Sequence, residues 1–143
     1  MNPTTAPTTA ATGSIGLLTK LSKVVFRRAT EETIGLRLKQ LMALQQLRDQ
    51  KGTCLQQGLA EMLMLDANNC VLLLNELDDA GYVERRRDPE DRRRHIVEIT
   101  AAGEEVLAEG ERRLEDLEDD VLGKLTAEER RRLHGLLAKA LAE

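Results

Sequence analysis

Residues Gly81 to Gly103 have the sequence GYVERRRDPEDRRRHIVEITAAG. Two β-like segments, Tyr82 to Arg86 and His95 to Ile99, stand on either side of a tip that is rich in arginine and turn-forming residues. Asp88 and Pro89 supply the turn, because proline presets φ and aspartate can hydrogen-bond to its own backbone. The stretch therefore predicts a β-hairpin with a positively charged tip.

The hairpin follows directly on a predicted helical segment that runs from Asp66 to Ala80. Four apolar residues in this segment recur at i, i+3, i+4 and i+7, and they are Cys70, Leu73, Leu74 and Leu77. That spacing predicts the buried stripe of a helix. A helix followed by a basic hairpin is typical of a winged helix-turn-helix, in which the helix lies in the major groove of DNA and the hairpin reaches the phosphate backbone or the minor groove.

Short motifs that span the hairpin and the segments before it form a pattern of their own. The hairpin carries the run Asp88-Pro89-Glu90-Asp91-Arg92-Arg93, then Val97-x-Ile99-Thr100-x-x-Gly103. Upstream stand Leu59-Ala60, Leu65-Asp66 and Leu77-x-x-x-Gly81. The pattern resembles that of the MarR (multiple antibiotic resistance regulator) family over nearly all of the chain after its N-terminal tail. The resemblance implies a homodimeric, mostly helical DNA-binding regulator, of a kind often released from DNA by a small ligand or by oxidation.

Helical periodicity continues outside the hairpin. Ser14 is expected to cap a first helix that runs to about Glu32, and a second helix is expected from about Arg37 to Gln50. Thr53 with Gln56 forms a capping-box pattern that opens a third helix. Asp66 is expected to cap the fourth.

Two further helices are expected in the C-terminal part, and both are amphipathic. Thr100 starts one with a heptad-like register of Leu107, Gly110, Leu114, Leu117 and Val121. Thr126 and Glu129 form a capping box for the other, which carries Leu133, Leu136, Leu137, Ala140 and Leu141 on one face. Too little sheet or loop is available to cover these faces, so we expect the terminal helices to pack against a second copy of the chain. An intramolecular bundle is the alternative.

The expected fold class is mainly α: a winged helix-turn-helix with a small β-hairpin wing, flanked by N- and C-terminal dimerisation helices. Residues 1–13 are small and polar, so they are expected to form a disordered tail. Residues 14–143 are expected to form a single MarR-like domain. In it, 14–34 and 101–143 are the dimerisation helices and 37–100 is the winged helix-turn-helix lobe.

The formal net charge of −4 argues, taken alone, against a nucleic-acid partner. The charge is segregated, however, because six arginines stand in the hairpin: Arg85, Arg86, Arg87, Arg92, Arg93 and Arg94. The acidic residues crowd a later helix, from Glu104 to Asp120. Since physiological salt screens charges beyond about 8 Å, the basic end can meet DNA while the acidic end faces away.

The hairpin arginines are expected to contact phosphates, and one of them to enter the minor groove. By resemblance to the family, that residue is Arg93, with Asp91 holding its guanidinium in a planar fork. Arg92 and Arg94 are expected to touch phosphates or to fold back on the hairpin. His95 is expected to lie in the hairpin near phosphate.

The predicted recognition helix supplies the base contacts. Asn68 and Asn69 stand at its N-terminal end, where an asparagine can pair with adenine in a bidentate way; the alternative is that they only begin the helix. Leu72 is apolar where the family usually offers polar groups, and it is expected to touch a thymine methyl. The expected DNA-binding residues are Asn68, Asn69, Leu72, Asn75, Arg85, Arg86, Arg87, Arg92, Arg93, Arg94 and His95, with Asp91 as the residue that orients the wing.

Enzymatic function is not predicted, because no catalytic motif, metal cluster or cofactor-binding loop occurs. Cys54 and Cys70 are expected to be buried thiols, too few for a disulfide framework. No membrane span or signal pattern is present, so a cytoplasmic location is expected. The expected partners are double-stranded DNA, a second copy of the chain and a small-molecule effector that the residues do not identify. A winged-helix module that binds only protein is the alternative function.

Overall fold

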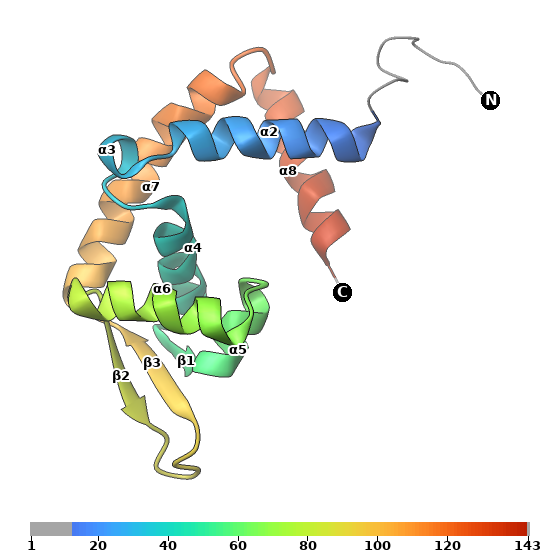
Figure 1. The fold of residues 1–143 in the computed structure, drawn as a ribbon. Helices are drawn as coiled ribbons and strands as arrows, with labels where there is room; N and C mark the ends of the chain where they lie inside the picture. Colours follow the sequence, from blue (N-terminus) through green and yellow to red (C-terminus); the bar gives the residue numbers. More distant parts are fainter. Residues whose placement is uncertain (1–12, 143) are drawn as a thin grey trace. The chain divides into compact units, whose positions relative to one another are not determined.

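The computed structural model describes residues 13–142 of the 143-residue chain, so the predicted disordered tail lies outside the described residues except for Gly13 (Figure 1). The elements, in chain order, are α2 (Ser14–Arg28), α3 (Glu31–Ile34), α4 (Leu38–Asp49), β1 (Thr53–Leu55), α5 (Gln56–Met62), α6 (Ala67–Asp79), β2 (Val83–Arg87), β3 (His95–Ile99), α7 (Ala101–Val121) and α8 (Ala127–Leu141). The fold is mainly helical with one small sheet, as predicted.

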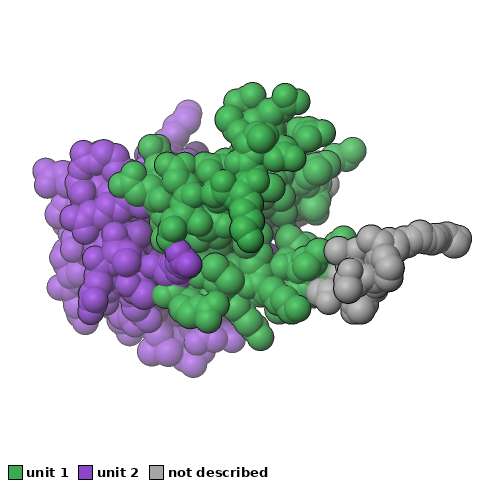
Figure 2. Space-filling model, turned by 90° about the horizontal axis from the view of Figure 1, so that it is seen from above, with its two compact units in different colours: residues 1–27, 114–143 green, residues 28–113 purple. Residues whose placement is uncertain are grey.

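The chain forms two compact units, which Figure 2 shows in different colours. Unit 1 takes its described residues from 1–27 and 114–143, and unit 2 is residues 28–113. The predicted division placed 101–113 with the dimerisation helices, whereas this first part of α7 belongs to unit 2. Gly110 accounts for the difference: it lies so close to α4 that a Cβ would stand 2.7 Å from Leu41 Cδ1 and 3.3 Å from the Ile34 carbonyl oxygen.

The hydrophobic core of unit 2 joins its helices to the sheet. The largest fully buried side chains are those of Ile34, Leu36, Leu41, Leu44, Leu47, Leu59, Leu74, Leu77, Val83, Val97 and Cys70. Fully burying one leucine or valine side chain stabilises a fold by about 1.5–3 kcal/mol relative to leaving it exposed. The predicted stripe of the recognition helix is confirmed, because its four apolar residues are all buried on α6.

Three antiparallel strands form the sheet in the order β1-β3-β2. Val97 in the central strand stands opposite Arg85 of β2 and Cys54 of β1. The two longer strands end at the pair Arg87 and His95, and residues 88–94 connect them. This hairpin, residues 83–99, is called the wing below, and residues 88–94 are its tip.

The predicted capping box of Thr53 and Gln56 is wrong. Thr53 to Leu55 form strand β1, which pairs with β3, and α5 begins only at Gln56 with Leu55 at its N-cap. Gly52 has a φ of 92°, a left-handed conformation that glycine adopts readily, and its carbonyl accepts a hydrogen bond from Ile99 N–H at 2.9 Å. The turn therefore delivers the next three residues to the open edge of β3.

The predicted limits of the first helix are also corrected. The carbonyl of Gly13 accepts the first helical hydrogen bond, from Leu17 N–H at 3.0 Å, so the N-cap falls on Gly13 and not on Ser14. The helix ends at Arg28, short of the predicted Glu32. Thr33 Oγ1 donates to the Arg28 carbonyl at 2.7 Å. This side-chain bond takes the place of the backbone hydrogen bond that a further helical turn would give to that carbonyl.

Candidate nucleic-acid interface

The tip of the wing is held by Asp88, which is buried with only 5% of its surface exposed. One carboxylate oxygen accepts a hydrogen bond from Glu90 N–H at 3.0 Å, and the other accepts one from Arg94 Nη2 at 2.7 Å. The backbone N–H of Asp88 also donates to the Arg94 carbonyl at 3.0 Å. The turn chemistry expected from the sequence is therefore present, and these bonds join the two sides of the tip. Figure 1 shows the wing reaching beyond α5 and α6.

Arg93 and Asp91 form the planar fork that was expected from the family resemblance. Arg93 Nε lies 3.1 Å from Asp91 Oδ1, and Nη2 lies 3.2 Å from Oδ2. The hydrogen bonds from the Arg93 guanidinium and then from the Arg93 backbone N–H hold the pKa of Asp91 below its usual range. The Arg93 side chain is 90% exposed, so its remaining N–H groups point to solvent.

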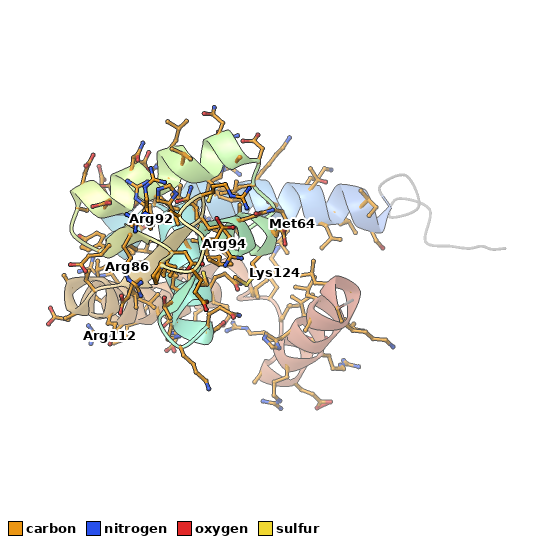
Figure 3. The ribbon with its side chains drawn as sticks, turned by 90° about the horizontal axis from the view of Figure 1, so that it is seen from below. Met64, Arg86, Arg92, Arg94, Arg112 and Lys124 are labelled. Carbon is orange, nitrogen blue, oxygen red and sulfur yellow. The ribbon has the colours of Figure 1, made fainter. Side chains whose placement is uncertain are left out.

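The other arginines at or next to the wing tip divide into those with a hydrogen-bond partner and those without a carboxylate partner. Arg94 folds back on the hairpin, since its guanidinium bonds to Asp88. Arg87 Nη1 donates to the Arg92 carbonyl at 2.7 Å. In the described part of the chain, the exposed guanidinium groups of Arg86 and Arg92 have no carboxylate partner, and Figure 3 shows them with Arg94 in the view from below.

Arg85 lies apart from this group. Its Nε donates to Asp78 Oδ2 at 3.1 Å and its Nη2 donates to Asn75 Oδ1 at 2.8 Å, so its guanidinium is bound to α6. Only 23% of the side chain is exposed. Of the six arginines expected to meet DNA, Arg85 is therefore the one whose guanidinium is bound to the side chains of α6.

Helix α6 begins as predicted, with Asp66 at its N-cap. Asp66 Oδ1 accepts from Asn69 N–H at 2.7 Å, and Asn69 Nδ2 donates to Asp66 Oδ2 at 3.0 Å. The side chain of Asn69 is thus tied to the helix cap. Asn68, Leu72 and Asn75 are exposed on the face opposite the buried stripe, and Leu72 is 53% exposed.

A cavity of about 420 Å³ lies between the wing tip, α5 and the N-terminal end of α6. The wing contributes Arg93, Arg94 and His95, and α5 contributes Gln56 and Gln57. The glutamines were not among the expected site residues. Their neighbours in sequence carry no binding motif, and only the pairing of β1 with β3 brings the start of α5 beside the wing.

The two cysteines lie in different surroundings. Cys70 is buried as predicted, with its Sγ 4.0 Å from the Gln56 carbonyl oxygen, whereas Cys54 is only half-buried. Burial raises the pKa of both thiols, so both stay protonated near neutral pH.

Within residues 13–142, no His, Cys, Asp or Glu side chains gather in the groups of three that could hold a metal ion. No helix in that range is long and apolar enough to cross a membrane.

Comparison with known proteins identifies relatives. A model of the MarR family matches residues 34–94. The HTH-type transcriptional regulator BilQ of Clostridium symbiosum is 32% identical over 89 residues, which cover 62% of this chain and 62% of BilQ. The uncharacterized HTH-type transcriptional regulator YdgJ of Bacillus subtilis is 33% identical over 84 residues, which cover 59% of this chain and 51% of YdgJ. The matches thus span less than two thirds of either relative.

Solved structures resemble the chain over more of its length. A probable transcriptional regulator from Pseudomonas aeruginosa has a TM-score of 0.76 at 28% identity, over 90% of this chain and 97% of that one. A mutant of MarR from E. coli, complexed with operator DNA, has a TM-score of 0.75 at 25% identity, over 88% and 91%. These relatives are transcriptional regulators and not enzymes, so the prediction of a non-catalytic protein is confirmed. The wing motif, the fold and these matches together make the chain similar to proteins of the MarR family and support its place among their winged helix-turn-helix proteins.

Proposed function

We propose that this chain is a transcriptional regulator that binds double-stranded DNA in the cytoplasm, with α6 in the major groove and the wing tip in the adjacent minor groove. The observation that carries the proposal is Arg93, which stands almost fully exposed at the tip while Asp91 fixes its guanidinium. A fixed, exposed arginine suits the strong negative potential of a narrow minor groove. The solved complex of an E. coli MarR mutant with operator DNA supports the proposal that this fold binds DNA.

The cavity beside the wing supports this arrangement. A major groove and the neighbouring minor groove are separated by one sugar-phosphate strand, so a helix in one and a wing in the other must lie on the two sides of that strand. The cavity of about 420 Å³ lies between those two elements. We propose that the strand passes through it, with Arg94 and His95 on one wall and Gln57 on the other.

We further propose that the chain acts as a homodimer through the helices of unit 1. Neither α2 nor α8 contains a buried residue in the single chain. Leu136 and Leu141 of α8 are 65% and 73% exposed. A groove of about 240 Å³ between α2, α7 and α8 is lined almost wholly by leucine and valine, among them Leu21, Leu117 and Leu133. Burial of these side chains against a second copy supplies the missing hydrophobic stabilisation.

A two-fold dimer presents two wings and two copies of α6. It therefore suits a near-palindromic operator whose half-sites lie about one turn of DNA, ~10 bp, apart.

The relatives also support a response to a small-molecule effector. The PcaV regulator of Streptomyces coelicolor has been solved with its natural ligand, and regulation by 6-hydroxynicotinic acid is described for BpsR of Bordetella bronchiseptica. We propose that a small molecule likewise alters DNA binding by this chain.

The test is selection of duplexes from a random library by the purified protein, followed by binding measurements across a salt series. We expect one enriched palindromic sequence and a linear fall of log K with log salt, because arginines release counterions from phosphates. If no duplex is enriched and binding does not depend on salt, the proposal fails. Wing-dependent capture of an acidic protein would then favour the alternative function, a protein-binding module.

A further inference from the structure

We propose that Arg85 sets the base preference of α6 by fixing the side-chain amide of Asn75 with its NH₂ group outward. In that orientation Asn75 selects guanine over adenine at one base pair of each half-site. The inference rests on the proposed binding of DNA by α6, and it assigns Arg85 to positioning Asn75 instead of contacting phosphate.

Asn75 stands on the face of α6 that points away from the core. It follows Asn68 by seven residues, and at about 100° per residue the two side chains lie within about 20° of each other around the helix. The preceding residue, Leu74, is fully buried on the other side, as is Leu77. A base edge that meets the exposed face of α6 therefore comes within reach of Asn75.

The contact with Arg85 decides which end of the amide faces outward. Arg85 Nη2 donates to Asn75 Oδ1 at 2.8 Å. A guanidinium has only donors, so it can meet the oxygen of the amide but not its NH₂ group. The oxygen is therefore turned toward β2, and the NH₂ group is turned away from it.

Arg85 is itself held in place. Its Nε donates to Asp78 Oδ2 at 3.1 Å, one helical turn beyond Asn75, and its side chain is three-quarters covered. On the sheet, Arg85 stands opposite Val97, which is fully buried. The guanidinium is thus fixed by one carboxylate and by the strand that carries it, so it has little freedom to release the amide.

The chemistry of the base edges turns this orientation into a preference. Adenine offers the N7 acceptor beside the N6 donor, so an asparagine that reads it must present its oxygen and its NH₂ group together. Guanine offers two acceptors, N7 and O6, side by side. With its oxygen engaged by Arg85, Asn75 presents two N–H donors, which match guanine. We expect guanine to be favoured over adenine by about tenfold, within the usual range for one good side-chain contact.

The experiment compares sequence selection by four full-length proteins: wild type, Asn75→Ala, Arg85→Met and Arg86→Met. Asn75→Ala locates the base pair, because the preference there should disappear. Arg85→Met should relax the preference at that same pair so that adenine is accepted about as well as guanine. Arg86→Met is the matched control, one residue along the same strand, with an exposed side chain that has no carboxylate partner in the described chain. It should weaken binding to all duplexes alike and leave the preference unchanged.

Asp78→Ala is the second variant, needed if Arg85→Met does not fold; it removes the anchor of Arg85 and should shift the preference in the same direction. Adenine at the Asn75-dependent pair in the wild type, or an unchanged preference in both Arg85→Met and Asp78→Ala, would overturn the inference. So would an Asn75→Ala protein with every wild-type preference intact, although DNA binding itself would stand. Failure of the wild type to select any duplex would overturn the proposed function together with the inference.

Discussion

Asp88 accepts a hydrogen bond at 2.7 Å from Nη2 of Arg94, six residues further along the chain, and it is the one charged residue that is buried among residues 13–142. A buried carboxylate is costly unless it is paired and hydrogen-bonded. Here the pair also closes the wing tip, because the backbone N–H of Asp88 donates to the Arg94 carbonyl. The conformation of the tip therefore depends on this pair.

Replacement of Arg94 by methionine should loosen the tip. The change keeps most of the side-chain stem but leaves Asp88 buried without its cation, which costs about 1–3 kcal/mol for an unsatisfied buried polar group. Hydrogen exchange at the Asp88 and Glu90 amides should accelerate. Arg92→Met is the control, because Arg92 is exposed, and it should change stability by less than about 0.5 kcal/mol. Equal exchange rates in both variants would mean that the pair does not hold the tip.

The fork between Arg93 and Asp91 should contribute to DNA binding as a unit. Arg93→Ala should weaken binding to all duplexes and reduce the slope of log K against log salt by about 1, because one phosphate or groove contact is lost. Asp91→Ala should also weaken binding, since the guanidinium then loses its fixed direction. Binding constants for both single variants and the double variant should be non-additive. Full additivity would mean that Asp91 does not act through Arg93.

The titration of Asp91 gives a separate measure of the fork. Its pKa in the folded protein is lowered, first by the side-chain hydrogen bond from Arg93, so the fork contributes stability above the usual pKa of aspartate and loses it as the pH falls through the lowered value. An NMR titration of the Asp91 carboxyl group should show this lowered pKa. The pKa should return toward its usual range in Arg93→Met. If the two proteins titrate alike, the fork is not formed in solution.

The elements that the sequence predicted well are those with a local signal. Asp66 caps α6 and Thr126 pairs with Glu129 at the start of α8, as the spacing of those residues indicated. The prediction of a helix cap at Thr53 failed because the conformation of this residue depends on the free edge of β3, more than 40 residues later, and not on its neighbours in sequence. A capping pattern and a short strand start can share the same residues.

The same distinction applies to the candidate site. The fork of Asp91 and Arg93 could be predicted because both residues stand in one motif two positions apart. Arg85 could not be separated from Arg86 by composition, since only the alternation of sides along β2 and the nearby end of α6 turn it toward Asp78. Gln57 carries no signal at all, because its place beside the wing follows from the tertiary fold.

Two glycines in helices should respond in opposite ways to alanine. A Cβ on Gly103 would meet the backbone carbonyl of Tyr82 and would stand 2.8 Å from Ile99 Cγ1, so Gly103→Ala should destabilise unit 2 by about 1–3 kcal/mol or more, as overpacking does. A Cβ on Gly135 of α8 would meet nothing within 4 Å. Gly135→Ala should therefore stabilise that helix by about 0.5–1 kcal/mol. Urea unfolding of both variants checks the pair, and a stable Gly103→Ala protein would contradict the close approach of α7 to the start of β2.

The proposed dimer makes Leu136 a decisive position. This side chain is 65% exposed in the single chain, so a charge placed there should not disturb the fold of one copy. In a dimer built on α8, the same charge would enter an apolar contact, and an unpaired buried charge is strongly unfavourable. Leu136→Glu should therefore lower the molecular mass measured by light scattering to that of one chain, with the helical circular dichroism signal retained. Arg131→Gln is the control, because Arg131 is exposed and precedes Leu136 by five residues, which at about 100° per residue places it on another side of α8. The Arg131→Gln protein should remain dimeric. A Leu136→Glu protein that stays dimeric at low micromolar concentration would place the interface elsewhere, and DNA binding by a monomeric Leu136→Glu protein at wild-type affinity would remove the dimer from the proposed mechanism.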